Sequence, residues 1–139
     1  MPRIAAIDFG LKRIGIALSD NRKTFALPFK VVEGGKRAVP NILAALAQKL
    51  PEIERILVGL PLLMNGKPGD MAQAVTLFAK ELEEKSKIPV ELCDERLSSK
   101  HAEQSLRELS LNRRERASQL DMSAAALLLQ SYLDKNAPN

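Results

Sequence analysis

Three acidic residues border apolar segments of the sequence, where carboxylates can bind a metal ion or position a water molecule. Asp8 ends the run Ile-Ala-Ala-Ile, Glu95 ends a run that begins at Pro89, and Asp121 stands within the apolar final stretch. Taken singly, Asp8 can begin a turn, and Asp121 can cap a helix that begins at Met122. A charge without a partner is costly to desolvate beside apolar surface, so three such positions together favour a shared chemical role.

The N-terminal part of the chain predicts three strands that would hold Asp8. The first strand and the start of its turn span Ile4–Gly10, and the second strand, Ile14–Leu18, follows closely enough for an antiparallel hairpin. Apolar residues alternate over residues 24–32, which predicts a third strand, and Pro28 within it favours a sheet edge. The sheet is therefore expected to begin as an antiparallel meander.

The rest of the chain alternates helices with two further strands. Residues 42–50 repeat apolar side chains at helical spacing up to Pro51, and residues 72–82 do so with a polar opposite face. The runs 55–59 and 89–95 predict strands, and the first is so apolar that it is expected at the centre of the sheet. A helix with an apolar stripe over residues 102–109 and a long helix over residues 117–133 complete the chain.

This order predicts an α/β fold with a mixed five-stranded sheet, antiparallel on one side and parallel on the other, and helices on both faces. Ligands of such sheets bind beyond the carboxyl ends of the parallel strands, where Asp8, Gly59 and Glu95 stand. In the final helix, Asp121 shares a face with Ala125 by the i, i+4 spacing. Asp121 is therefore expected to point toward the sheet.

Composition limits the class of protein. The chain has 139 residues, 45% of them hydrophobic, which fits a single domain over residues 1–139. A net charge of +4 favours a polyanionic partner. Cys93 is the single cysteine, which excludes an internal disulfide and a cysteine-based zinc site and fits a reducing cytoplasm. No apolar run is long enough to span a bilayer, so we expect a soluble, cytoplasmic protein.

Four motifs follow one another along the chain: Asp8-Phe9-Gly10-Leu11-Lys12-Arg13-Ile14-Gly15, Gly59-Leu60-Pro61-Leu62-Leu63-Met64-Asn65-Gly66, Asp94-Glu95-Arg96-Leu97-Ser98-Ser99 and Asp121-Met122-Ser123-Ala124-Ala125. Their succession resembles the YqgF family, a group of Holliday-junction-resolvase-like proteins described as pre-16S rRNA nucleases. The resemblance implies an RNase H-like fold, a bacterial origin, metal-dependent phosphodiester hydrolysis and a role in maturing the 5′ end of small-subunit ribosomal RNA. It also carries the family's acidic positions onto Asp8, Glu95 and Asp121.

In the strand order that the resemblance implies, the middle parallel strand separates the backbones of Asp8 and Glu95 by about 10 Å. Gly59 on that middle strand leaves room for the two side chains to converge. Convergent carboxylates stay ionised only beside a cation, and oxygen ligands suit Mg²⁺ or Mn²⁺. We therefore expect Asp8 to bridge the metal, with Glu95 and Asp121 as flanking ligands, whereas Asp94 alternates onto the opposite face.

Basic residues near these acids are candidates for binding substrate phosphates, which gives salt-sensitive affinity. Charged runs of this kind more often form a solvated surface, and only proximity to the acidic motifs favours the binding interpretation. Aromatic residues make up 4% of the chain, which disfavours a base-stacking platform. The candidate substrate-binding residues are Lys12, Arg13, Arg96, Lys100, Arg113, Arg114 and Arg116.

Other functions share parts of this pattern. Asp8-Phe9-Gly10 also suits the phosphate loop of an actin-like or sugar-kinase-like ATPase, although those proteins pair two such domains. A noncatalytic nucleic-acid-binding relative would need none of the acids, and all three are present. The same acidic chemistry serves precursor ribosomal RNA and Holliday-junction DNA. A monomer or homodimer and an association with ribosomal particles are all compatible with the sequence.

Overall fold

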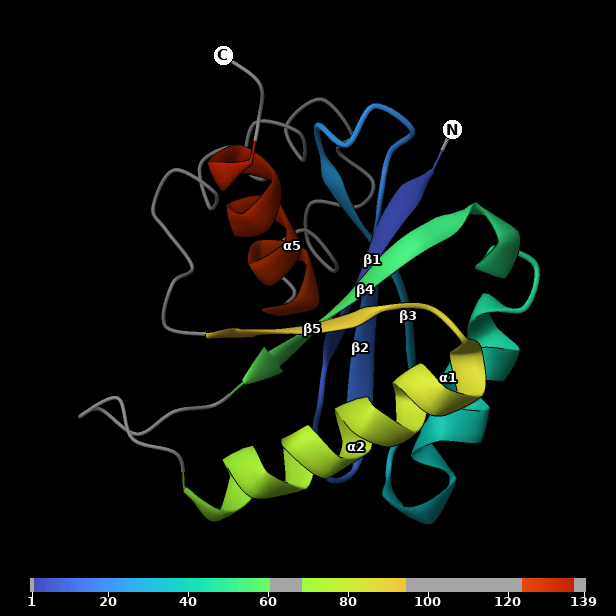
Figure 1. The fold of residues 1–139 in the computed structure, drawn as a ribbon, viewed down its shortest axis with the longest axis vertical. Helices are drawn as coiled ribbons and strands as arrows, with labels where there is room; N and C mark the ends of the chain where they lie inside the picture. Colours follow the sequence, from blue (N-terminus) through green and yellow to red (C-terminus); the bar gives the residue numbers. More distant parts are fainter. Residues whose placement is uncertain (1, 61–68, 95–123, 137–139) are drawn as a thin grey trace.

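The five strands form one mixed sheet in the order β3-β2-β1-β4-β5 (Figure 1). The computed structural model describes residues 2–60, 69–94 and 124–136. β1 pairs antiparallel with β2, which pairs antiparallel with β3, whereas β4 is parallel to both β1 and β5. The predicted antiparallel and parallel halves are thus confirmed. The strands are β1 (Arg3–Asp8), β2 (Arg13–Ser19), β3 (Ala26–Glu33), β4 (Ile53–Leu60) and β5 (Val90–Asp94).

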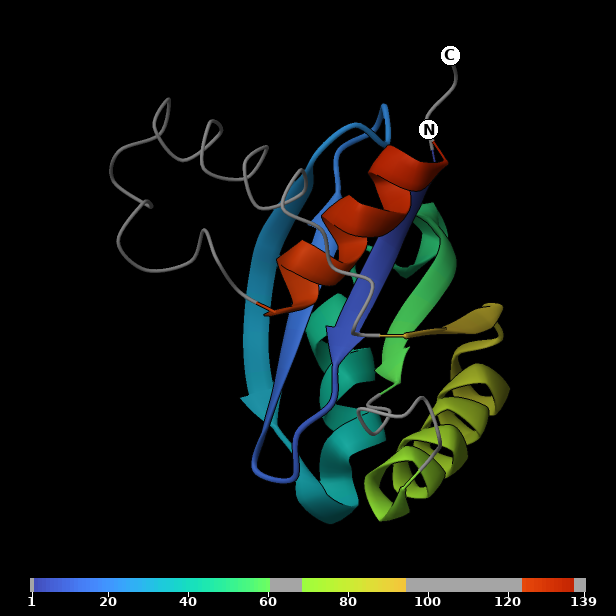
Figure 2. The ribbon, with the colours of Figure 1, turned by 90° about the vertical axis from the view of Figure 1, so that its left-hand side faces the viewer.

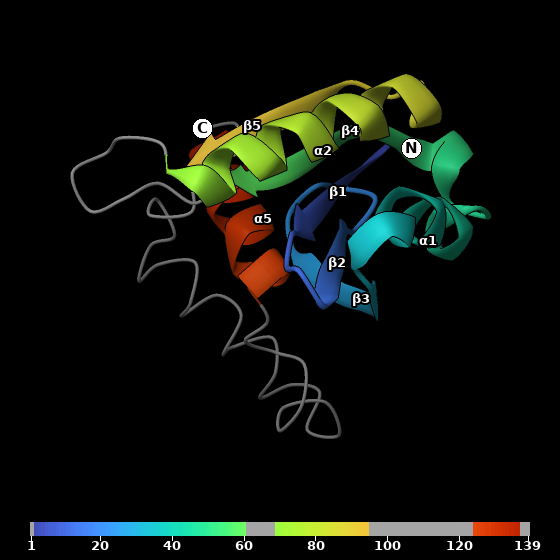
Figure 3. The ribbon, with the colours of Figure 1, turned by 90° about the horizontal axis from the view of Figure 1, so that it is seen from below.

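Helices cover both faces of the sheet. α1 (Ala38–Leu46) and α2 (Asp70–Ser86) lie on one face, and α5 (Ala124–Lys135) lies on the other (Figures 2 and 3). Two short 3₁₀ helices, η1 (Gly35–Arg37) and η2 (Leu50–Glu52), precede α1 and β4. No helix within the described ranges is long and apolar enough to cross a bilayer.

The central strands are apolar because each of their faces packs against a helical layer. Ile7 and Val58 belong to the core beneath α1 and α2, whereas Ala6 and Leu57 belong to the core beneath α5. All four side chains are fully buried. The prediction that the run at residues 55–59 forms a central strand is therefore confirmed.

β3 lies at the edge of the sheet, as Pro28 predicted. Pro28 stands opposite Ala17, next to a register shift between Ile16 and Ala17. Since proline has no N–H group to donate to a neighbouring strand, it is tolerated at an edge or beside such an irregularity.

The predicted helix over residues 42–50 is shorter at its C-terminal end. α1 ends at Leu46, and Leu50 instead begins η2. Pro51 disfavours α-helical backbone at Leu50, the residue before it, so the helix is not expected to extend to residue 50. Ile42 and Leu46 still face the core as the spacing predicted.

Gln130 fixes α5 against the β2–β3 hairpin. Its buried side-chain oxygen accepts a hydrogen bond from the Ala26 N–H at 2.9 Å, and its Nε2 donates to the Thr24 carbonyl oxygen at 2.9 Å. Nε2 also donates to Oδ1 of Asp134 at 3.0 Å. These bonds satisfy polar groups that would be costly to bury alone, so they set the position of α5 along the sheet.

Candidate active site

Asp8 is the last residue of β1 and pairs with Gly15 of β2. Side chains alternate along a strand, so Asp8 lies on the same face as Ala6, which packs beneath α5. Phe9 turns to the opposite face, where the centroid of its ring lies 4.7 Å from the centroid of the Phe78 ring. The half-buried Asp8 carboxylate is therefore presented on the α5 face at the carboxyl end of a central strand.

Small residues surround Asp8 on this face. A Cβ atom placed on Gly15 would lie 3.9 Å from the Asp8 Cβ and 3.8 Å from the Ala125 Cβ. Neither Gly15 nor Ala125 has atoms beyond Cβ, so space remains around the carboxylate. An oxygen ligand in such a space fits Mg²⁺ or Mn²⁺.

The parallel strands reach the same edge of the sheet. Gly59 of β4 pairs with Cys93 of β5, and Leu60 pairs with Asp94. β4 lies between β1 and β5, which confirms the expected placement of the middle strand. Glu95 follows β5 directly and lies outside the described residues, as does Asp121.

Within the described ranges, no three potential ligands among His, Cys, Asp and Glu gather into a metal-binding group. Asp8 is therefore the member of the predicted triad whose surroundings the structure describes.

A polar cluster that the sequence did not predict connects β4, β5 and α5. Nη1 of Arg55 donates to Oε1 of Glu91 and to the Tyr132 hydroxyl, both at 2.8 Å. The Tyr132 hydroxyl, and after it Glu91, raises the pKa of Arg55. Only the tertiary structure reveals this cluster, because its members are 36 and 77 residues apart in sequence.

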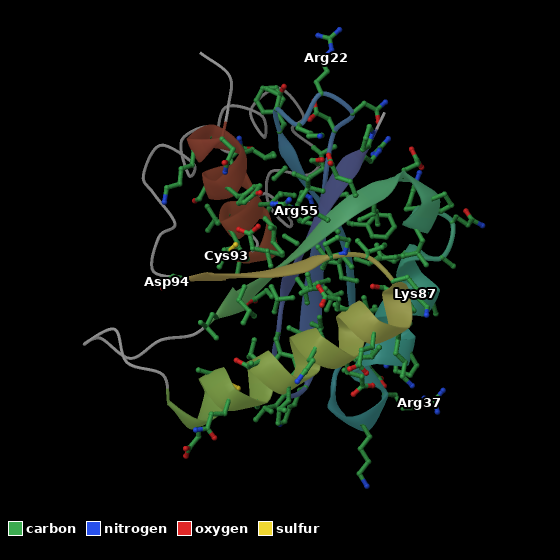
Figure 4. The ribbon with its side chains drawn as sticks, in the orientation of Figure 1. Arg22, Arg37, Arg55, Lys87, Cys93 and Asp94 are labelled. Carbon is green, nitrogen blue, oxygen red and sulfur yellow. The ribbon has the colours of Figure 1, made fainter. Side chains whose placement is uncertain are left out.

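A cavity of about 450 Å³ lies between β5 and α5, beside this cluster. Arg55, Cys93 and Asp94 all line this cavity and lie near one another in Figure 4. Burial, and after it the charge of Glu91, raises the pKa of Cys93 to about 11. The thiol is half-buried and packs against the core beneath α5, as is usual for a free cysteine, which behaves as a small apolar residue.

Of the predicted substrate-binding residues, the structure describes two. Lys12 and Arg13 are exposed in the β1–β2 connection, at the same edge of the sheet as Asp8. The remaining predicted residues, which lie outside the described part, are Arg96, Lys100, Arg113, Arg114 and Arg116.

Sequence reasoning missed a second basic pair at this edge, Lys36 and Arg37 in η1. Their signal is a Lys-Arg dipeptide after two glycines, at the end of the predicted meander. Only the pairing of β2 with β3 reveals that this dipeptide comes next to Lys12 and Arg13.

Comparison with known proteins finds relatives along nearly the whole chain. The profile of the RuvX family, described as Holliday junction resolvase, matches residues 2–135. A protein of Protochlamydia amoebophila named "Putative pre-16S rRNA nuclease" is 44% identical over 140 residues, covering 95% of this chain and 93% of its own. A protein of the same name from Chloroflexus aurantiacus is 39% identical, covering 98% of this chain and 89% of its own.

Two solved structures have a similar fold. The Fowlpox virus resolvase in complex with Holliday junction DNA has a TM-score of 0.57 at 16% identity and covers 98% of this chain and 99% of its own. The RuvC protein of T. thermophilus in complex with a Holliday junction substrate has a TM-score of 0.54 at 17% identity, covering 98% of this chain and 97% of its own. These likenesses confirm the predicted RNase H-like fold.

Proposed function

Because the chain belongs to the RuvX family, we propose that it is a divalent-metal-dependent nuclease that processes the 5′ end of precursor 16S ribosomal RNA. The observation that carries this proposal is the position of Asp8 at the carboxyl end of a central strand, in a space bounded by Gly15 and Ala125. The names of the relatives supply the substrate. On this proposal the chain is a single nuclease domain over residues 1–139 that acts in the cytoplasm on nucleic acid, free or in ribosomal particles.

The residues that would hold the metal are Asp8, Glu95 and Asp121, with Asp8 as the central ligand. Alternation along β5 supports Glu95, because Cys93 packs against the core beneath α5 and Glu95 is two residues further along the chain. Asp121 precedes Ala125 by four residues in the sequence, the spacing of one turn in the helix predicted over residues 117–133, and Ala125 lies beside Gly15 and thus near Asp8. When bound, Mg²⁺ or Mn²⁺ activates a water and offsets the charge that develops on phosphate oxygens.

The protein's own basic residues bind and orient the substrate. Lys12 and Arg13 stand beside Asp8 and neutralise phosphates next to the scissile one, which lowers the repulsion between substrate and carboxylates. The proposal extends this role to Arg96, Lys100, Arg113, Arg114 and Arg116. The chain is proposed to bind its substrate either as a monomer or as a homodimer.

Resolution of four-way DNA junctions is the second candidate function. The description of the RuvX family and the fold shared with two junction-bound resolvases favour it. Because both functions use the same acidic chemistry, the two differ only in the nucleic acid that the surface around Asp8 accepts.

The test compares cleavage of precursor ribosomal RNA and of a four-way DNA junction, each in Mg²⁺, in Mn²⁺ and in EDTA. We expect metal-dependent cleavage with the RNA preferred, and loss of cleavage in Asp8→Asn. Asp20→Asn is the matched control, since Asp20 Oδ1 accepts from the Thr24 and Phe25 N–H groups and an asparagine oxygen can do the same. Near-normal cleavage by Asp8→Asn would refute the proposed site, and preference for the junction would favour the resolvase.

A further inference from the structure

Two Lys-Arg pairs lie in adjacent connections at the edge of the sheet where β1 ends. Lys12 and Arg13 close the β1–β2 connection, and Lys36 and Arg37 form η1 after β3. All four residues are exposed. Arg13 stands opposite Glu33, the last residue of β3. Lys36 and Arg37 follow Glu33 by three and four residues, so the second pair comes close to the first. We call these four residues the basic rim; Figure 3 views the molecule from this side.

The backbone holds the two connections together. The Gly34 N–H donates to the Lys12 carbonyl oxygen at 2.9 Å. A Cβ atom on Gly34 would lie only 2.7 Å from the Gly10 oxygen and 2.8 Å from the Leu11 oxygen, so this contact requires glycine. The two pairs therefore keep a fixed spacing relative to each other and to Asp8.

The four cations form no ion pair with any residue that the structure describes. Among the described residues, ion pairs form between Arg3 and Glu52, between Lys23 and Glu54, and between Arg55 and Glu91, and none involves the rim.

The position of the second pair is also electrostatically unfavourable. Arg37 is the N-cap residue of α1, Lys36 precedes it, and the first turn of α1 contains no acidic residue. Cations at a helix N-terminus oppose the helix dipole. The dipole of α1 therefore gives this pair no stabilising role, and a polyanionic ligand would neutralise the two charges.

We propose that the basic rim binds the phosphates of a double-helical segment of the substrate next to the scissile phosphate. This inference rests on the proposed nuclease function and extends the substrate contact from Asp8 across β2 and β3 toward α1. It commits to a duplex because single-stranded binding relies on exposed aromatic platforms. Phe9, the aromatic residue of the two connections, packs on Phe78 instead. Fixed cations at the surface suit the fixed phosphates of a duplex.

The test uses the full chain with both Lys36→Ala and Arg37→Ala. The matched control carries Arg22→Ala and Lys85→Ala, which remove the same two residue types from exposed positions. Arg22 lies in the β2–β3 turn, at the opposite end of the molecule from Arg37 (Figure 4), and Lys85 lies in the last turn of α2. Affinity is measured without divalent metal, so that no cleavage occurs, for an RNA duplex and for a single strand of the same length at several salt concentrations.

We expect the rim variant to bind the duplex more weakly and to reduce the slope of log K against log salt by about 1.8, since each phosphate contact contributes about 0.9. The single strand should show a smaller change, and the control should match wild type. The melting temperature of the rim variant should equal or exceed that of wild type, because an unfavourable charge at α1 is removed. If the alanine variant fails to fold, Lys36→Gln with Arg37→Gln keeps the aliphatic stems and replaces it.

Three outcomes overturn the inference. A duplex salt slope equal to that of the control means that the rim contacts no phosphate, and if wild type still cleaves in an Asp8-dependent way, the proposed function stands. Equal losses for duplex and single strand refute the commitment to a duplex. If wild type neither binds nor cleaves any nucleic acid, the proposed function and the rim are both wrong.

Discussion

The alternation of side chains along β1 explains why the Asp8 carboxylate is only half-buried. Ile7 points into the core beneath α1 and α2, Asp8 into the space beside Gly15, and Phe9 back toward Phe78. The sequence predicted this placement, because an apolar run that ends in Asp and then Gly marks where a buried strand leaves the sheet.

Removal of the Asp8 charge should not destabilise the protein when metal is absent. With Glu95 and Asp121 as its proposed neighbours, Asp8 meets like-charge repulsion that Asp8→Asn relieves. We expect the free energy of unfolding in EDTA to stay equal or rise by up to about 1 kcal/mol. Urea denaturation of both proteins in EDTA measures this. A clear loss of stability would mean that the carboxylate has a structural role.

Cys93 should react slowly with thiol reagents. Burial first, and the charge of Glu91 second, raise its pKa to about 11, so the reactive thiolate is scarce near pH 8. We expect alkylation at pH 8 to be at least about tenfold slower than in urea-unfolded protein, which contains the same single cysteine. The alkylation rate of the folded protein should keep rising with pH beyond 9, whereas the alkylation rate of the unfolded chain should level off there.

The same shift in pKa affects stability. The folded state holds the Cys93 proton more tightly than the unfolded state does. The resulting contribution to the free energy of unfolding is therefore complete below the unfolded pKa of about 9 and is lost as pH rises toward 11. Cys93→Ala should lose less stability over that interval than wild type. Equal reactivity of folded and unfolded Cys93 at pH 8 would contradict both expectations.

At the scale of the elements, local patterns predicted the strands and helices of the described residues well, whereas the predicted helix over residues 102–109 lies outside them, and contacts between distant segments were not predicted. Pro28 and the apolar run of β4 correctly indicated an edge and a centre. The hydrogen bond from the Ala26 N–H to Gln130 joins residues 104 positions apart, and no local pattern indicates it. The neighbourhood of Lys12 and Lys36 was equally hidden, since it depends on the register of β2 and β3.

Gly34 and Gly35 are required for two different reasons, which are close contact at Gly34 and a positive φ at Gly35. Gly34 has φ −90°, which any residue adopts, but its Cβ would clash with backbone oxygens of the β1–β2 connection. Gly35 has φ +81°, yet nothing lies within 4 Å of its Cβ position. Gly34→Ala therefore tests steric contact, and Gly35→Ala tests backbone strain.

We expect Gly35→Ala to cost about 1 kcal/mol, as for other residues forced to positive φ. Gly34→Ala should cost more, on the order of 2 kcal/mol, and should also weaken duplex binding because the two connections move apart. Thermal unfolding and the binding assay above measure both. If Gly34→Ala changed neither quantity, the close approach of the two connections would not matter to the fold or to the basic rim.

For the molecule as a whole, the strand order decides where chemistry can occur. β1, β4 and β5 run parallel, so Asp8, Leu60 and Asp94 end at one edge, and the β1–β2 connection brings Lys12 and Arg13 to that edge as well. The N-terminal end of α5 arrives beside Asp8 at Ala125. Asp8, Asp94, Lys12 and Arg13, which are spread along the sequence, thereby lie at one edge of the sheet, and this arrangement would suit the proposed metal-dependent cleavage of a polyanionic substrate.

Thermal stabilisation by metal distinguishes a nuclease from an ATPase, the two functions that share the Asp8-Phe9-Gly10 turn. If Asp8, Glu95 and Asp121 hold the ion, Mg²⁺ or Mn²⁺ at 100 times its dissociation constant stabilises the folded state by about 2.7 kcal/mol, which raises the melting temperature on the order of 10 °C. Glu95→Gln and Asp121→Asn should each show a much smaller rise. Glu84→Gln, an exposed residue of α2, is the control and should match wild type. ATP without metal should have little effect on a nuclease, which needs no nucleotide clamp. Strong stabilisation by ATP that neither substitution alters would instead identify a kinase-like phosphate site and refute the nuclease.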